Sequence, residues 1–447
     1  MFTLSMQATV IRRVTGRQRI VRALALLAVP AVLAAGCGDG GDSTTANPTG
    51  QVRYYGTDGN MSNTFGDLFK DAPGAINGMT GTTPLTPLGV DFVAKLREVD
   101  PKLRDYNYAG ESYDAVVISA LAAEVAGTTE PAAVAAQINA VTSGGSRCES
   151  PAQCLNLIHQ GRDIAYRGVS QLAGFTDAGE PAAGSYGTLY FGKNNTIEDG
   201  RTEYVPAGDV AGASTKAAPK PGDRKPGQLV IGGLLPQTGS LALMGPPMFA
   251  GAELGILDVN AAGGILDSPV KWIPGDDGTS EAVAKKTTQR LIDEGAHVII
   301  GAGASGISTA VLPLAVQAGV ILFSPCNTAA SLTTAADNGL YFRTAPADGL
   351  QAKALTDILM RDGARRVFIV ARDDAYGQGL DEGVTSSLHL AGVADVKSFR
   401  YNVDKPSFSG LGAQVKEFRA DAVLLVGFEE SADAIKDIAA AGITVRG

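Results

Sequence analysis

Two hydroxyl-bearing residues stand where short apolar runs end, one strand–helix unit apart. Ser305 follows the apolar run 298–300, and Thr328 follows the apolar run 320–323. Short apolar runs bounded by Gly- or Pro-containing loops are typical of strands buried on both faces of a parallel sheet. Open α/β sheets bind ligands beyond the carboxyl ends of their strands. Hydroxyl and backbone N–H groups near helix N-termini favour an anionic group, so Ser305 and Thr328 are candidates for holding one.

Two other interpretations of these loops remain open. Gly301, Gly303 and Gly306 match the spacing of a dinucleotide-binding fingerprint that follows a strand. That fingerprint needs an acidic residue about 20 positions further on, and residues 321–327 contain none, so the match is weak. The loop could also be a Gly-rich turn with a purely structural role.

Regular strand–loop–helix units that begin at residue 228 must position these loops. Such repeats imply parallel sheets with helices on both faces. About ten strands are predicted in the whole chain, which is more than one sheet comfortably holds. The sequence therefore predicts an α/β protein of two doubly wound lobes. Lobe 1 has residues 228–345 as its core, and lobe 2 has residues 346–447.

A separate segment, residues 51–205, precedes these units. It predicts helices over 112–126 and 131–141, followed by an antiparallel pair of strands near 185–192 and 202–205. Residues 206–227 are rich in Ala, Gly, Pro and Lys and show no apolar periodicity. We expect them to form a flexible linker.

The N-terminus has the pattern of a targeting segment. Five arginines within residues 12–22 precede the apolar run 23–35, which is too short to span a bilayer comfortably and fits a signal-peptide core. The run leads into Leu33–Cys37, which resembles a bacterial lipobox. We expect a signal peptide over 1–36, lipid on Cys37 and a polar tether over 37–50, with plain secretion as the alternative.

Composition and charge narrow the functional classes. Of 447 residues, 45% are hydrophobic and 6% aromatic, with 56 glycines, as in soluble α/β proteins. Removal of the five N-terminal arginines changes the formal net charge from −9 to −14. An exported chain this acidic is not expected to bind nucleic acid.

The four cysteines fit an exported protein. Cys148 and Cys154 lie six residues apart in a polar loop, which favours a local disulfide. A metal pair is the alternative, but the three histidines are scattered along the chain. Cys326 is expected to be a buried free thiol.

Several motifs together resemble the exported branched-chain amino-acid-binding proteins of ABC importers, which have the type I periplasmic binding fold. The resemblance covers nearly all of 51–205 and 228–447. It is carried by Ile231–Gly239, Asn260–Ile265, Gly301–Ser305, Ser324–Thr328, Asp374–Gly379 and Tyr55–Gly59.

The order of the segments departs from that family. Residues 51–205 resemble the family's end and come first, so the chain resembles a circular permutant in which 206–227 join the old termini. The new ends would interrupt one strand near Val52 and Val445. Permutation is tolerated where the old ends lie close together. A rival account is two incomplete halves of different copies, or a rearranged reading frame.

The resemblance implies an amino acid held between two lobes that close like a hinge. Ser305, the Cys326 backbone and Thr328 would hold the α-carboxylate, and Asp58 would take the α-ammonium. The side-chain region would be lined by Met244, Tyr376 and Phe428. Each role has a plainer alternative: Asp58 could be a turn residue, Tyr376 core packing, and Phe428 a shield that does not touch ligand.

These observations favour a monomeric solute-binding lipoprotein that delivers a small polar ligand to the permease subunits of an ABC importer. It would sit on the outer face of the cytoplasmic membrane and need no cofactor or metal. A receptor of the same fold that reports to a membrane partner is the alternative. An enzyme is least expected, because no nucleophile–base spacing is present. We interpret Glu429–Glu430 as a solvated helix start.

Overall fold

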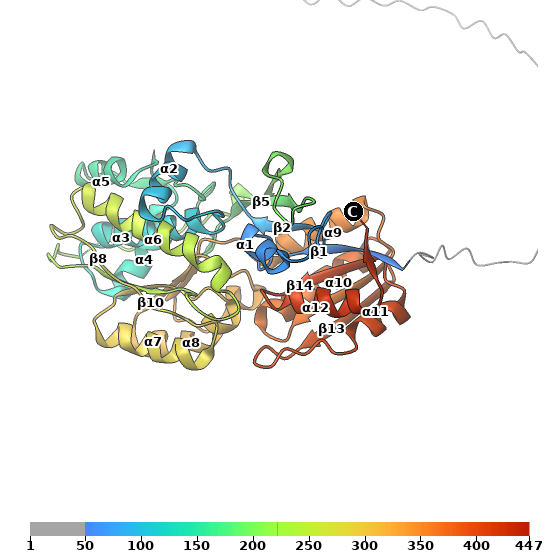
Figure 1. Ribbon diagram of the computed structural model, residues 1–447. Coiled ribbons are helices and arrows are strands. Elements are labelled where there is room, and N and C mark those ends of the chain that lie inside the picture. The colour runs from blue at the N-terminus through green and yellow to red at the C-terminus, as the bar shows by residue number, and fades with distance from the viewer. Residues whose placement is uncertain (1–49, 221, 447) are drawn as a thin grey trace, which may run out of the picture. The chain divides into compact units, whose positions relative to one another are not determined.

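The computed structural model describes residues 50–220 and 222–446, which lie in one compact unit (Figure 1). The predicted signal peptide, Cys37 and nearly all of the tether lie outside the described residues. Across the described ranges, no helix is both long enough and apolar enough to cross a membrane.

Lobe 1 is built on a five-stranded parallel sheet in the order β11-β10-β9-β7-β8. Its strands are β7 (Val230–Leu234), β8 (Lys271–Ile273), β9 (Val298–Gly301), β10 (Ile321–Ser324) and β11 (Tyr341–Arg343). Strands β7, β9, β10 and β11 are wholly buried, as their apolar sequences require when helices cover both faces.

Helices cover this sheet on two sides (Figure 1). On one side α7 packs against α8, and on the other α3 packs against α6 and α4. Their bounds are α3 (Ala109–Ala126), α4 (Pro131–Val141), α6 (Gly245–Ala261), α7 (Glu281–Asp293) and α8 (Ser305–Ala318), with α2 (Val90–Val99) and α5 (Pro151–His159) nearby.

Lobe 2 is built on an eight-stranded sheet in the order β13-β12-β14-β1-β2-β5-β6, with β15 pairing β1. Its strands are β1 (Gln51–Gly56), β2 (Thr80–Pro84), β5 (Ala183–Tyr190), β6 (Glu203–Gly208), β12 (Arg366–Arg372), β13 (Asp395–Tyr401), β14 (Ala422–Val426) and β15 (Thr444–Val445). The pairings are parallel as far as β2 and antiparallel from β2 through β5 to β6. Its helices are α9 (Asp348–Arg361), α10 (Ala375–Leu390), α11 (Leu411–Phe418) and α12 (Ser431–Ala440), where α9 packs on α10 and α11 on α12. The short helix α1 (Asn63–Gly66) follows β1.

Residues 51–205 contribute to both lobes. Strand β1 pairs in parallel with β14 on one side and β2 on the other, so it lies inside the lobe 2 sheet. Helix α3 instead packs on α6 and touches β9 and β10 of lobe 1. The two parts of the chain therefore share both cores.

The expected strand break near the ends of the chain is wrong in detail. Thr444 and Val445 form β15, which runs parallel to β1 with Gln51 opposite Thr444 and Val52 opposite Val445. The two ends are thus neighbouring strands rather than two pieces of one strand.

The segment 206–227 is more ordered than its composition predicts. Strand β6 continues to Gly208, and the Lys225 N–H donates to the Gly127 carbonyl. The Gln137 amide donates to the Pro219 carbonyl at 2.9 Å. One backbone and one side-chain hydrogen bond thus fasten the segment to the end of α3 and to α4.

Cys148 and Cys154 form a disulfide, with their Cα atoms 5.3 Å apart. The bond joins β3 (Ser146–Cys148) to α5, close to β4 (Ile164–Tyr166), which pairs with β3. Cys326 is a buried free thiol.

Candidate functional site

The loops that follow β9 and β10 are joined by buried hydrogen bonds. The Ser324 hydroxyl donates to the Ala302 carbonyl at 2.8 Å and accepts from the N–H groups of Cys326 and Asn327. Ser305 is the first residue of α8, and its hydroxyl accepts from the Ala329 N–H at 3.3 Å. These bonds fix Ser305 beside the loop that carries Thr328.

Thr328 offers an unused hydroxyl in this region. It is 1% exposed, and its hydroxyl meets no described group in good hydrogen-bond geometry, although it lies close enough to the buried Asp348 carboxyl to lower the pKa of that group. Buried polar groups without partners are uncommon because each costs free energy. The unsatisfied hydroxyl marks a place where a ligand atom could bind.

The Gly-rich loop after β9 does not suit a dinucleotide. The Gly303 N–H donates to the buried Asp277 carboxyl at 2.9 Å, so this N–H is already used within the protein and is not free to bind a phosphate. A Cβ on Gly301 would lie 2.0 Å from the Leu234 carbonyl oxygen, so close packing requires this glycine. The glycine spacing therefore has a structural cause here.

On the lobe 2 side of the candidate site, several buried hydrogen bonds converge on Asp58. It follows β1, is 4% exposed and accepts three side-chain hydrogen bonds. The Tyr376 hydroxyl (2.7 Å) and the Gln351 amide (2.9 Å) donate to Oδ1, and the Tyr108 hydroxyl (2.7 Å) donates to Oδ2. Burial raises the pKa of Asp58, and the three donors oppose that rise.

Tyr108 reaches this carboxylate from the other lobe. It precedes α3, which packs on the lobe 1 sheet, and adopts a left-handed φ of 63°. A non-glycine residue rarely holds that conformation unless its surroundings fix it. A second link between the lobes runs from the Glu429 N–H to the Ser240 carbonyl at 3.2 Å. The loops of the two lobes therefore meet at Asp58.

Two aromatic rings form an apolar wall beside Asp58. Tyr376 stacks on Phe428 with ring centroids 5.8 Å apart, and the Tyr376 hydroxyl accepts from the Thr57 hydroxyl at 2.7 Å. The Arg372 guanidinium lies 3.9 Å from the centroid of Phe428. Met244 is also buried.

The interpretation of Glu429–Glu430 as a solvated pair is wrong for Glu430. Glu429 is exposed, but Glu430 is 7% exposed and forms an ion pair with Arg372. The Tyr401 hydroxyl donates to the same carboxylate at 2.7 Å. Arg372 also contacts Phe428, so this buried pair supports the aromatic wall.

Sequence reasoning missed Tyr108, Gln351 and Asp348. Gln351 and Asp348 follow β11 at the start of α9, so the rule of strand carboxyl ends could have found them. Within the described residues, neither Asp348 carboxyl oxygen has a partner in good hydrogen-bond geometry, and burial raises the pKa of Asp348 to about 8, with Asp58 adding to the rise and the nearby Thr328 hydroxyl opposing it. No local signal links Tyr108 to Asp58, which lies fifty positions earlier.

The arrangement brings hydroxyl and N–H donors and buried carboxyl groups together where the two lobes meet. Ser305, Thr328 and the N-terminus of α8 offer hydroxyl and N–H groups, and Asp58 offers a carboxylate. Charge-assisted hydrogen bonds in such surroundings contribute roughly 1.5–3 kcal/mol each. The site can therefore bind a small molecule with an anionic and a cationic end.

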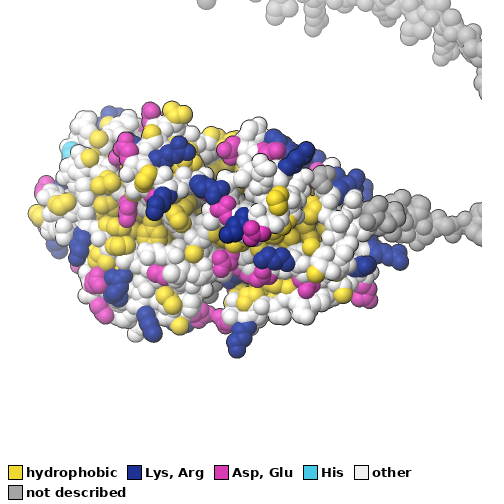
Figure 2. All heavy atoms as spheres, viewed as in Figure 1, with side chains coloured by type: hydrophobic (Ala, Val, Ile, Leu, Met, Phe, Trp, Pro, Cys, Tyr) yellow, Lys and Arg dark blue, Asp and Glu magenta, His cyan; other side chains and the backbone are white. Residues whose placement is uncertain are grey.

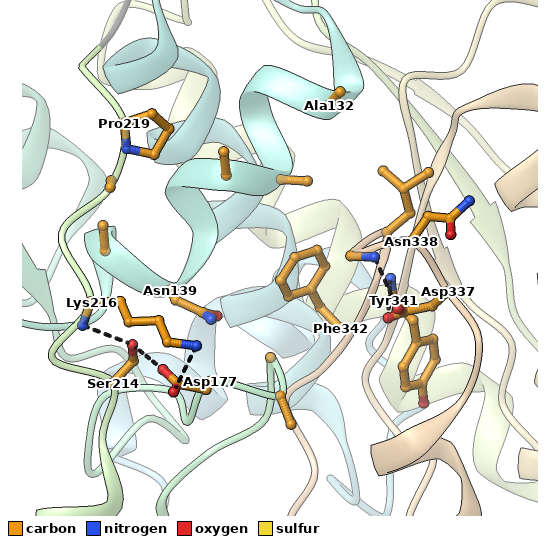
Figure 3. Close-up of a pocket in the computed structure, with 18 of the residues that line it drawn as sticks. Ala132, Asn139, Asp177, Ser214, Lys216, Pro219, Asp337, Asn338, Tyr341 and Phe342 are labelled. Carbon is orange, nitrogen blue, oxygen red and sulfur yellow. Dashed lines mark hydrogen bonds and ion pairs between the residues drawn. The ribbon is translucent and has the colours of Figure 1, made fainter.

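A cavity of about 670 Å³ lies away from Asp58, between α4, residues 214–219 and β11. Figure 3 shows Phe342 and Asn139 facing it, with Lys216 paired to Asp177 at 3.0 Å on one wall. None of the predicted ligand residues lines this cavity. We place the candidate site at Asp58 instead, because buried polar groups converge there.

Comparisons with known proteins match about half of the chain. Residues 228–447 match a family model described as periplasmic binding protein. The Leu/Ile/Val-binding protein BraC3 of Rhizobium johnstonii is 26% identical over 45% of this chain and 54% of its own length. An amino acid binding protein of Pseudomonas aeruginosa is 27% identical over 49% of this chain and 59% of its own length. The chain thus spans little more than half the length of the relatives it matches.

Among solved structures, one similar chain has been reported as a leucine-binding protein. A leucine-binding protein LivK from Thermotoga maritima is 23% identical, with 47% of this chain and 60% of that chain covered and a TM-score of 0.43. The family match itself rests on the sequence of residues 228–447. Residues 228–447 therefore belong to the periplasmic binding protein family and are similar to the Leu/Ile/Val-binding proteins.

Proposed function

We propose that this protein binds an amino acid of the branched-chain type between its two lobes and delivers it to the permease of an ABC importer. The observation that carries the proposal is Asp58, a buried carboxylate held by donors from both lobes. Because Tyr108 belongs to lobe 1, closure of the lobes completes the surroundings of Asp58.

The proposed ligand lies with its α-carboxylate toward Ser305 and Thr328 and its α-ammonium toward Asp58. The unpartnered Thr328 hydroxyl supports the first contact. An apolar side chain would pack against Met244, Tyr376 and Phe428, which are all buried, with the two rings stacked on each other. The relatives named Leu/Ile/Val-binding proteins support this class of ligand.

The proposal also covers the location of the protein in the cell. We propose that the chain is exported and anchored through lipid on Cys37, which follows an apolar run and a lipobox-like sequence. The mass of the protein extracted from membranes tests this, because lipid adds to the mass of the N-terminal peptide. An unmodified Cys37 in that peptide contradicts the anchor.

The ligand proposal is tested by the melting temperature of the purified protein with a panel of amino acids. We expect leucine-like amino acids to raise it, because ligand that binds only the folded state stabilises it. Asp58→Asn should abolish the rise, because the ammonium loses its charged partner.

The matched control is Asp114→Asn. Asp114 is also buried and accepts from a tyrosine hydroxyl, Tyr166 at 2.7 Å, but is not among the ligand residues. This variant should melt lower and still respond to ligand. A panel that leaves wild-type melting unchanged would remove the amino-acid proposal.

A further inference from the structure

A second cavity, of about 520 Å³, lies beside the first residues of β1. Four cationic and two acidic side chains line it: Arg53, Lys193, Arg201, Arg446, Glu198 and Asp362. The lining therefore carries a formal excess of two positive charges, in a chain whose net charge is −9. None of the residues assigned to the amino-acid site is among them.

The acidic residues of this cavity are already engaged. Arg201 pairs with Glu198 at 2.7 Å and stacks over the Tyr190 ring, 4.4 Å from its centroid. Arg53 donates to the Asp362 backbone carbonyl at 2.6 Å, and the Tyr55 hydroxyl donates to the Asp362 carboxylate at 2.9 Å. These contacts hold the walls of the cavity in place.

Lys193 and Arg446 carry the remaining charge. Both are exposed, and neither side chain has an ion pair or hydrogen bond among the residues that the structure describes. They reach the cavity from distant parts of the chain, because Lys193 follows β5 and Arg446 follows β15. The fold therefore brings two unpaired cations to one cavity.

Neutral donors complete the lining. The amides of Asn77 and Asn194 and the hydroxyl of Thr196 face the same cavity and make no side-chain hydrogen bond within the described ranges. A lysine, an arginine and several neutral donors suit an anion with three or four oxygens better than a carboxylate with two. A phosphate group has that chemistry.

The place of the cavity suggests where such a group comes from. Figure 2 shows Lys and Arg side chains gathered at the end of the unit where β1 begins. Cys37, the expected lipid-bearing residue, is thirteen positions before Gly50, so covalent geometry keeps the two within about 45 Å. An anchored chain would hold this cavity near the headgroups of a bilayer.

We propose that this cavity binds a phosphate group, with Lys193 and Arg446 as its charged contacts. The group can be the phosphodiester of an anionic phospholipid or inorganic phosphate, and the two sources are separable. Binding at this cavity is independent of the amino-acid site, so either proposal can fail alone.

The test compares the full chain with the double variant Lys193→Glu/Arg446→Glu. Inorganic phosphate is titrated by calorimetry, and sedimentation measures binding to vesicles of phosphatidylglycerol or of phosphatidylcholine. The control is Lys286→Glu/Lys405→Glu, which makes the same change of charge at two exposed lysines away from the cavity. Neither of these side chains has a partner among the residues that the structure describes. The N-terminal segment is common to all three proteins and cancels in the comparison.

We expect the wild type and the control variant to bind at least tenfold more tightly than the cavity variant, and less tightly as salt rises. Binding to phosphatidylglycerol but not inorganic phosphate identifies a headgroup site, and binding to inorganic phosphate identifies a soluble anion. The proposal is overturned if neither probe binds the wild type, or if the control variant loses as much binding as the cavity variant.

Discussion

At the scale of single residues, the site depends on buried polar groups that are only partly satisfied. Asp58 has three donors, whereas the Thr328 hydroxyl and both Asp348 carboxyl oxygens have no partner in good hydrogen-bond geometry in the described chain. A buried group without a partner costs about 1–3 kcal/mol. Such a cost is tolerable where a ligand later supplies the missing contacts.

Asp348 gives a prediction about pH. Burial raises its pKa from 3.8 to about 8, so the folded protein keeps a proton that the unfolded chain releases near pH 4. This group therefore stabilises the fold fully below about pH 4, and that stability is lost as pH rises toward about 8. The loss amounts to roughly 1.4 kcal/mol per pH unit within the window.

The measurement is urea unfolding of wild type and Asp348→Asn at about pH 5 and about pH 7. The wild-type free energy of unfolding should fall more steeply than that of the variant, by roughly 1.4 kcal/mol per unit. Asn cannot titrate, so equal slopes would show that Asp348 is ionised in the folded state. Other buried carboxyls, such as Glu111, affect both proteins alike.

At the scale of elements, the sequence predicted the strands of lobe 1 and the loops that follow them. The sequence-based predictions were wrong where a contact with a distant residue or strand determines the structure. Glu430 is drawn into the core by Arg372, and β15 pairs beside β1 instead of continuing it. Neither partner lies close in sequence, so no local pattern could show them.

Arg343 gives the prediction at this scale. It is 0% exposed and donates to Glu180 (2.9 Å from Nε), to the Thr333 hydroxyl and to the Ala329 carbonyl. It thereby ties the loop that carries Thr328 to the first half of the chain. Arg343→Met should lower the free energy of unfolding by about 3–5 kcal/mol, because Glu180 is left without its partner.

Urea unfolding checks this, with Arg361→Met as the control. Arg361 pairs with Glu203 at 2.9 Å, but both side chains are about half exposed. Its loss should cost at most about 1 kcal/mol. A cost for Arg343→Met no larger than that of the control would contradict the role of the buried pair.

At the scale of the whole molecule, we propose that the order of the segments is a circular permutation of the family order. The family match covers only residues 228–447, yet β1 lies between β14 and β2, and α3 packs on lobe 1. Each core is therefore incomplete without residues 51–205. The same interleaving gives a prediction about fragments.

Residues 228–447 expressed alone should not unfold cooperatively, because they lack β1 and α3. Heating followed by circular dichroism should show a broad transition for this fragment and a sharp one for the full chain. Co-expression with residues 37–227 should restore the sharp transition if the two pieces assemble. A sharp, two-state melt of 228–447 alone would refute the shared cores and weaken the permutation.

The sequence alone determined the local features of this protein. Apolar runs, glycine-containing loops and helix starts follow from neighbouring residues, so the α/β class and the positions of Ser305, Thr328 and Asp58 were predictable. Tertiary structure alone decided which polar groups meet. Tyr108 comes to Asp58 from another lobe, and Lys193 comes to the cavity of Arg446, because strand pairing and helix packing join segments that local patterns do not connect.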